Sequence, residues 1–452
     1  MRQFHQNLGL RAPSQLTNTV RYFPIVFFQI FLTFTIVVFA FGPWDWPINN
    51  PLTLYAFLIA VQGMFLLGYL HAAKGREPAP FHVSIQPQNY VWLCAVVSLI
   101  EVGPVTYQQT GGDINFLRAL LNPGDAYHVA HETVMSAGYN PWAYLWIMLS
   151  PLIWPLLPLT IFYWNRLSIG IKMLASIGVL AGAVSFWLIG TNKRLVDIMI
   201  LTPWLMVLRS EAPARALNLK KISRFAMALG MAGMLFLPYF GLNIITRGST
   251  GGIQSIAVAE NQRVVPAVIE LHGFEGRLAD AYTSGATALA SYVGQGYYGL
   301  SLSLQEPFVW CYGVGHSVFY SWVAGKVTGT DYKEILDRSY PRRIDRDFGW
   351  SADIKWASIY PYLASDVSFL GVPIVMYFFG RLLALTWIDS LGKNPFAVIV
   401  FSLTAITIFY ASGNAQVFQD PDTVNVFYFY LVMWYLSNAR YQPPVMIRRF
   451  AR

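Results

Sequence analysis

Repeated apolar runs, many of them close to 20 residues long, constrain this chain more than any other feature of its sequence. A helix needs roughly 20 apolar residues to cross the ~30 Å hydrocarbon core of a bilayer. Because strands or loops would leave backbone polar groups without partners in lipid, such runs indicate helices. We therefore expect an all-α polytopic membrane protein with about ten spans, at residues 22–41, 52–70, 90–105, 142–163, 169–189, 195–208, 225–245, 362–387, 396–410 and 424–436.

The charges give an orientation to these spans. Only 12% of the residues are charged, against about 25% in a soluble domain, and the formal net charge is +8. The Lys and Arg residues gather before the first span, in loop 209–224 and in the tail from 440 onward. Basic segments of a membrane protein stay on the cytoplasmic side, so both termini are expected there. The positive charge is accounted for in this way, and no nucleic-acid partner is predicted.

A polar stretch separates two strongly apolar parts of the chain. Residues 246–361 are predicted to form one large extracytoplasmic loop within a single integral domain, 1–452. Inside this loop, segments 286–304 and 308–323 are apolar enough to insert as a pair, which would give about twelve spans. Alternatively, they lie re-entrant at the outer surface, and their Tyr, Gly, Gln and Ser residues favour a lined cavity over contact with lipid.

Two adjacent cations stand where the fifth span meets the predicted outer face, in Gly190-Thr-Asn-Lys-Arg194. Charges near a membrane are costly unless they are paired, reach the headgroups or serve a function. Lys193 and Arg194 could bind a diphosphate, since the guanidinium fork matches phosphate oxygens. The plainer interpretation is that they extend to the headgroups, with Asp197 one turn along as a partner.

Further cations lie in the large loop. Arg247 opens a Gly-rich turn that would let the backbone approach an anion, although no nucleotide-binding P-loop follows. The remaining candidates for an anionic substrate are Arg263, Arg277, Arg338, Arg342, Arg343 and Arg346. Several acidic residues are interleaved with them, so solvated or salt-bridged charges are the structural alternative.

Candidate catalytic groups lie in the same part of the chain. His316 follows a Tyr-Gly-Val-Gly turn, and histidine often acts as a general base; a structural histidine in an outer loop is the alternative. Asp345 is another possible base. Asp366 lies inside an apolar run, where an acid is either functional or paired with an arginine of the bundle.

The aromatic rings of Tyr297 and Tyr298 could stack on sugars, or they could pack a helix. The two cysteines, Cys94 and Cys311, suggest neither a disulfide framework nor a metal site. No metal-binding motif is present in the sequence, and we expect no cofactor.

The pattern resembles the bacterial O-antigen and oligosaccharide repeat-unit polymerases, which are related to the O-antigen ligases. The resemblance covers most of the chain as topology and a few short motifs as residues. Gly190-Thr191-Asn192-Lys193-Arg194 is similar to the family's Arg-bearing end of a middle span, and Arg338 to Gly349 to an Arg and Gly spacing in its outer loops. Tyr362-Leu363, Asp366 and Gly371 are similar to the span that follows the large loop. Ser358-Ile359 stands near the place of the family's His-Asn pair, which leaves His316 as the substitute candidate.

The resemblance implies a C-type glycosyltransferase in the bacterial inner membrane. It would polymerise oligosaccharide repeat units linked to undecaprenyl pyrophosphate, on the periplasmic side, without nucleotide sugar or metal. Arginines would stabilise the departing diphosphate, and one base would deprotonate the acceptor hydroxyl. The implied partners are the lipid-linked oligosaccharides, membrane lipids and a chain-length regulator. The rival functions are a ligase that transfers glycan to lipid or protein, a flippase or other transporter, and a non-catalytic scaffold.

Overall fold

The computed structural model describes residues 16–439, apart from 79–80, 82–84, 137–140, 211–226, 228–229, 232, 242–273 and 354. Within these residues the chain forms helices and connecting segments and no strand. The first half contains α2 (Asn18–Phe41), α3 (Pro51–Ala73), α4 (Pro87–Gln109), α5 (Phe116–Leu121), α6 (Pro123–Ser136), α7 (Pro141–Ile153), α8 (Leu156–Tyr163), α9 (Ile169–Leu188) and α10 (Lys193–Arg209). The second half contains α13 (Phe274–Ser303), α14 (Val318–Thr328), α15 (Tyr332–Asp337), α16 (Tyr340–Phe348), α17 (Ile359–Leu391), α18 (Pro395–Phe409), α19 (Gln416–Gln419) and α20 (Pro421–Ala439).

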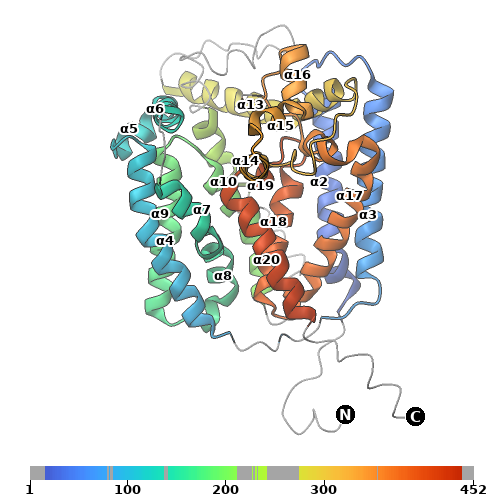
Figure 1. The fold of residues 1–452 in the computed structure, drawn as a ribbon. Helices are drawn as coiled ribbons and strands as arrows, with labels where there is room; N and C mark the ends of the chain where they lie inside the picture. The colour runs from blue at the N-terminus through green and yellow to red at the C-terminus, as the bar shows by residue number, and fades with distance from the viewer. Residues whose placement is uncertain are drawn as a thin grey trace, which may run out of the picture.

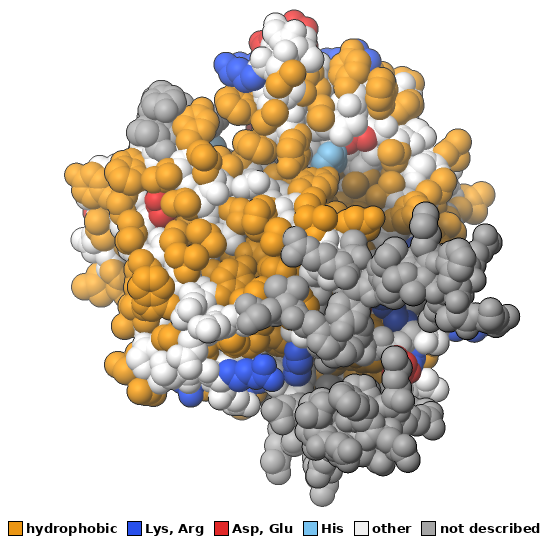
Figure 2. Space-filling model, turned by 60° about the horizontal axis from the view of Figure 1, so that its bottom comes forward, with side chains coloured by type: hydrophobic (Ala, Val, Ile, Leu, Met, Phe, Trp, Pro, Cys, Tyr) orange, Lys and Arg blue, Asp and Glu red, His pale blue; other side chains and the backbone are white. Residues whose placement is uncertain are grey.

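Six of the described helical stretches are long and apolar enough to cross a membrane, counting α7 and α8 together as one. Their outward faces carry large apolar side chains, such as Ile59 at 72% exposure and Leu370 at 90%. Figure 2 shows apolar side chains over much of one face, with Lys and Arg side chains near its lower and upper edges. A soluble monomer rarely exposes so much contiguous apolar surface. The fold is therefore consistent with the expected polytopic membrane protein, and α5, α6, α13 and α16 lie together at one end of the bundle (Figure 1).

Two of the expected spans are interrupted. The stretch 142–163 is divided into α7 and α8 around Trp154 and Pro155. Proline lacks the backbone N–H that a helix interior requires, so a break there is the expected consequence. The helix α17 also changes direction at Ser368, which has φ 62° and ψ 167°. This break places Asp366 directly before an irregular turn of the backbone.

Close contact between α3 and α17 holds one side of the bundle together. A Cβ atom on Gly380 would come within 2.0 Å of the carbonyl oxygen of Phe65, and one on Gly68 within 1.9 Å of the oxygen of Tyr377. Only glycine permits such an approach, as at other small-residue interfaces between membrane helices.

Buried polar contacts join α2, α3 and α17 at the end opposite α16. Arg21 donates to the carbonyl oxygens of Ala73 (2.6 Å) and Arg76 (2.7 Å), and it forms an ion pair with Glu77. Arg76 in turn donates to both carboxylate oxygens of Asp389. This network satisfies charges that would otherwise be costly at the edge of the apolar bundle.

The segments 286–304 and 308–323 do not form a pair of long helices, which one of the two alternatives required. The first belongs to α13, which accepts hydrogen bonds from Trp44 at Thr287 and from Asn50 at Ser301. Both donors lie in the connection between α2 and α3, so α13 stays at that one end of the bundle, as Figure 1 shows. The second segment is irregular up to Ser317, and only its last part enters α14. Gln295 and Tyr297 of the first segment are buried against the rest of the protein, which explains why this run carries polar groups.

Candidate functional site

The turn before α10 fixes the two adjacent cations of the sequence motif. Gly190 has φ 67°, and a Cβ there would come within 2.3 Å of the carbonyl oxygen of Pro123. The chain can therefore turn against α6 only with glycine at this position. Lys193 follows at the first position of α10 and forms an ion pair with Asp420, so its charge is neutralised within the protein.

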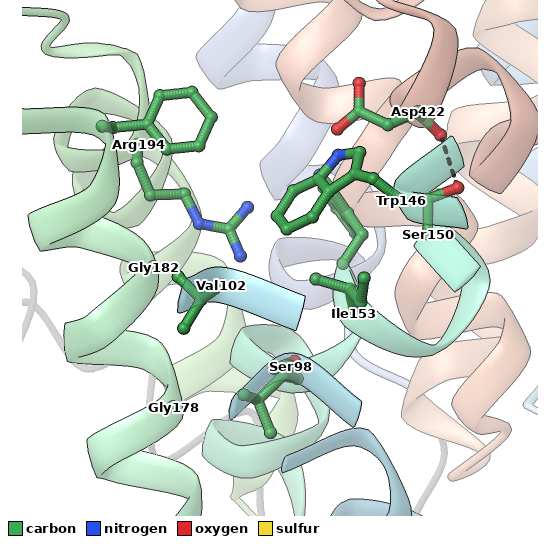
Figure 3. Close-up of a pocket in the computed structure, with 12 residues that line it drawn as sticks. Ser98, Val102, Trp146, Ser150, Ile153, Gly178, Gly182, Arg194 and Asp422 are labelled. Carbon is green, nitrogen blue, oxygen red and sulfur yellow. Dashed lines mark hydrogen bonds between the residues drawn. The ribbon is translucent and has the colours of Figure 1, made fainter. Parts of the chain in front are cut away.

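Arg194 differs from its neighbour because its guanidinium lines a cavity of about 30 Å³. Among the described residues it makes no hydrogen bond and no ion pair. The carboxylates of Asp197 and Asp422 interact with its guanidinium only through longer-range electrostatics. In Figure 3, Arg194 on α10 and Asp422 on α20 face this cavity from opposite sides, with the ring of Trp146 between them. A half-buried cation without a direct counter-ion is a candidate ligand for an anion.

The predicted catalytic residues His316 and Asp366 lie in direct contact. The Nδ1 atom of His316 lies 2.7 Å from Oδ2 of Asp366. The same carboxylate accepts backbone N–H groups from Gly315 (2.7 Å) and His316 (3.0 Å). Since an ionised carboxylate only accepts hydrogen bonds, this contact favours the neutral tautomer with the proton on Nδ1, in which Nε2 is an acceptor. The side chains are 16% and 9% exposed, so the pair is shielded without being sealed.

The local sequence explains why the loop before His316 binds the carboxylate of Asp366. Tyr312 and Gly313 both have positive φ, 60° and 78°, which turns the chain sharply before His316. At Gly315 a Cβ would come within 2.5 Å of the Cβ of Cys311 and 3.0 Å of the Cβ of Ser365. Glycine at this position therefore lets the loop backbone pack closely against α17 just before its break. The N–H groups of the loop can then bind Asp366.

Three further side chains complete the surroundings of His316. The hydroxyl of Tyr428, on α20, lies 3.2 Å from Nε2 of His316. Gln419 donates its side-chain N–H to the main-chain oxygen of His316 at 2.8 Å. The ring of Phe418 packs edge-on against the imidazole, with 5.7 Å between the ring centroids. The imidazole is thus held from the carboxylate side and from α19 and α20.

The short segment from α19 to the start of α20 connects the two parts of the site. Asp420 pairs with Lys193 and also accepts a hydrogen bond from Gln416 at 3.0 Å. The preceding residue, Gln419, holds the His316 loop, and Asp422 lines the Arg194 cavity. Arg194 and the His316–Asp366 pair therefore flank one polar segment, so the fold brings together predicted residues that are far apart in sequence.

The four predicted arginines of 338–346 all contact protein groups. Arg342 forms two hydrogen bonds with Asp353 (2.9 and 2.8 Å), which raise the pKa of its guanidinium. Arg343 is buried, with Glu306 at 3.3 Å and the carbonyl of Pro307 at 2.6 Å. Arg338 donates to the carbonyl oxygen of Trp310, and the exposed Arg346 pairs with the adjacent Asp347. The ion pairs of Arg342, Arg343 and Arg346 match the salt-bridged alternative given by the sequence. The bond of Arg338 goes to a neutral carbonyl oxygen.

Two further predicted site residues, Asp345 and Tyr297, make contacts that stabilise the fold. Asp345 accepts the backbone N–H of Ala352 at 3.1 Å and so stabilises the turn after α16. Tyr297 is fully buried, and its hydroxyl bonds to that of Thr35 at 2.8 Å. A ring enclosed in this way cannot stack on a sugar, which corrects the expectation for Tyr297.

Tyr298 is only partly buried, but its ring packs against two tryptophan rings of the protein. It stacks on Trp46 with 5.5 Å between centroids and meets Trp350 edge-on at 4.9 Å. The aromatic cluster ties α13 to the α2–α3 connection, which matches the helix-packing alternative. Arg247 and Arg263 lie outside the described residues, as does the side chain of Arg277 in α13.

The sequence interpretation missed Gln419, Asp422 and Tyr428. The polar run Gln416-Val-Phe-Gln-Asp-Pro-Asp422 before the last span was a usable signal, because charged residues next to a span often mark a site. No sequence signal singled out Tyr428 from the other tyrosines of α20.

Cys311 lies beside this site without being a reactive group. It is fully buried, and burial together with the nearby charge of Asp366 raises the pKa of its thiol to about 12. It is therefore protonated at neutral pH and a poor nucleophile. Among the residues whose positions are described, no cluster of His, Cys, Asp and Glu could hold a metal ion. Comparisons with family models, curated proteins and solved structures find no match to this chain.

Proposed function

We propose that this protein is a membrane glycosyltransferase that polymerises oligosaccharide repeat units carried on a lipid diphosphate. The observation that carries the proposal is Arg194, a cation that lines a cavity without a direct counter-ion, next to the segment that holds the His316–Asp366 pair. A departing diphosphate needs positive charge, and a sugar acceptor needs a base. The chain offers both groups at one end of an apolar bundle.

In the proposed reaction, the hydroxyl oxygen of the acceptor sugar attacks the anomeric carbon of the donor glycan. The bond between that carbon and the diphosphate oxygen breaks, and the diphosphate leaves with the electron pair. The hydroxyl proton passes to Nε2 of His316, while Asp366 keeps the imidazole in the required tautomer. Arg194 stabilises the charge that develops on the leaving diphosphate.

Two side chains would have to move for this chemistry. The cavity of about 30 Å³ has room for only about one or two water molecules, so a diphosphate enters only if a lining side chain such as Trp146 turns aside. The hydroxyl of Tyr428 occupies the position beside Nε2 that the acceptor hydroxyl would take. Asp422, across the cavity, could accept a hydrogen bond from a sugar hydroxyl.

The test is in vitro polymerisation of purified lipid-linked repeat units, with chain length read on gels. Arg194→Ala should lower the rate by about 10²–10³-fold, the usual effect of removing one group that stabilises developing charge. Arg346→Ala is the matched control, because Arg346 is exposed and pairs only with its sequence neighbour. Normal polymer from the Arg194 variant would contradict the proposal.

The same variant in cells separates polymerase from ligase. A polymerase defect leaves single repeat units attached to their final acceptor. Accumulation of long lipid-linked chains would instead indicate a ligase and would overturn the polymerase assignment.

A further inference from the structure

A large open groove runs along the outer part of α4, next to the start of α7. Its volume is about 680 Å³, and its surface is almost wholly apolar. It is formed by Gly103, Pro104 and Tyr107 of α4, by Ile114 in the following loop and by Trp142 of α7. Tyr107 and Ile114 are 61% and 55% exposed, so the groove is open to the surroundings of the bundle. Its volume lies in the range typical of sites for small ligands.

This groove and the Arg194 cavity use the same two helices. Val102 and Trp146 line the cavity, while Gly103 and Trp142 line the groove. Val102 and Gly103 are consecutive, and the two tryptophans are one turn apart on α7. An elongated ligand could therefore extend along the boundary between α4 and α7, with one end at each site.

The two sites differ in chemistry in a way that fits one class of ligand. One holds a cation without a direct counter-ion, and the other is an apolar trough on a helix that is itself a candidate span. A soluble anion would gain nothing from the trough, because only apolar groups are stabilised by burial there. A molecule with a charged head and a long hydrocarbon tail would use both.

We infer that the groove between α4 and α7 binds the polyprenyl chain of the lipid diphosphate whose phosphates meet Arg194. This inference rests on the proposed function, since it names the part of the protein that recognises the lipid part of that substrate. Trp146 lines the Arg194 cavity one helical turn from Trp142 of the groove, and it is the side chain that the headgroup displaces when the polyprenyl chain is bound.

Gly103 offers a direct test, because a Cβ built there meets no atom within 4 Å. Gly103→Leu therefore fills the groove without displacing protein. Gly63→Leu is the matched control: it lies on α3, is equally open and lines neither site. Binding of undecaprenyl diphosphate to the purified protein in nanodiscs is measured, with inorganic pyrophosphate as a tail-free probe.

We expect Gly103→Leu to weaken binding of undecaprenyl diphosphate at least about tenfold, the equivalent of roughly two methylene groups left unburied. Pyrophosphate binding should be unchanged in this variant and lost in Arg194→Ala. If Arg194→Ala loses both ligands while Gly103→Leu binds like the parent, the groove assignment is wrong and the proposed function stands. Unchanged binding in Arg194→Ala would remove the basis of both. Equal competition by a two-chain phospholipid would overturn the assignment to a polyprenyl chain.

Discussion

At the residue scale, the partner of each charged side chain decides what it can do. Five of the predicted cations, Lys193 and the four arginines of 338–346, bind protein carboxylates or carbonyls. Among the predicted cations whose side chains the structure describes, Arg194 has no such partner, which makes it the candidate for binding a substrate. The sequence named all six, but it could not rank them, because a counter-ion such as Asp420 comes from a distant part of the chain. The same holds for His316 and Asp366, which were proposed separately and lie 2.7 Å apart.

A prediction at this scale concerns the acid that orients the base. Asp366→Asn keeps the size of the side chain but loses the charge that holds the proton of His316 on Nδ1. We expect polymerisation to fall by about 10²–10⁴-fold, the usual contribution of general base catalysis. The measurement is the initial rate with purified lipid-linked repeat units.

Asp347→Asn serves as the control for the Asp366 variant. Its carboxylate is held by Arg346, whose hydrogen bond lowers the pKa of Asp347, and it lies away from His316. Full activity of Asp366→Asn would refute the assigned role of the pair.

At the element scale, irregularities in helices create the site. The break of α17 at Ser368 and the glycine turn before His316 let a loop amide reach a carboxylate of a spanning helix. The long apolar runs predicted where these helices lie. They did not predict the breaks or the course of α13, since hydropathy measures the environment of a segment and not its direction.

The glycine contact between α3 and α17 gives a prediction about stability. Gly380→Ala places a methyl group against the carbonyl of Phe65, which belongs to a helix backbone and cannot yield easily. We expect destabilisation by about 1–3 kcal/mol, as for other overpacked sites. Thermal unfolding of the solubilised protein, followed by tryptophan fluorescence, measures this.

Gly63→Ala is the control for this contact. It lies on the same α3, where a Cβ meets no atom within 4 Å, and it gains helix propensity of up to about 1 kcal/mol. Equal destabilisation by both substitutions would show that the glycine contact is not what holds the helices.

At the scale of the whole molecule, the candidate site residues are gathered at one end of an apolar bundle. Asn50, at the start of α3, contacts α13, and α3 then runs 23 residues, about 35 Å, to Lys74 at the other end. The α16 helix lies with α13 at the site end (Figure 1). The distribution of basic residues predicts that this end faces away from the cytoplasm.

This orientation can be tested with single introduced cysteines, since both native cysteines are buried. A membrane-impermeant maleimide should label Arg346→Cys in intact cells, or in spheroplasts if an outer barrier excludes the reagent. Lys74→Cys should react only after the membrane is opened. The reversed pattern would place Arg194 and His316 on the cytoplasmic side and would contradict the proposed reaction there.

The sequence alone determined the all-helical class and the approximate position of the apolar helices. Burial in lipid is a property of each local run of side chains, and backbone hydrogen bonding in lipid leaves the helix as the solution for such runs. Only the tertiary structure decided that Arg194 lacks a direct counter-ion, that His316 meets Asp366, and that α13 stays at one end of the bundle. These features depend on contacts between residues far apart in the chain, and no local pattern of residues encodes them.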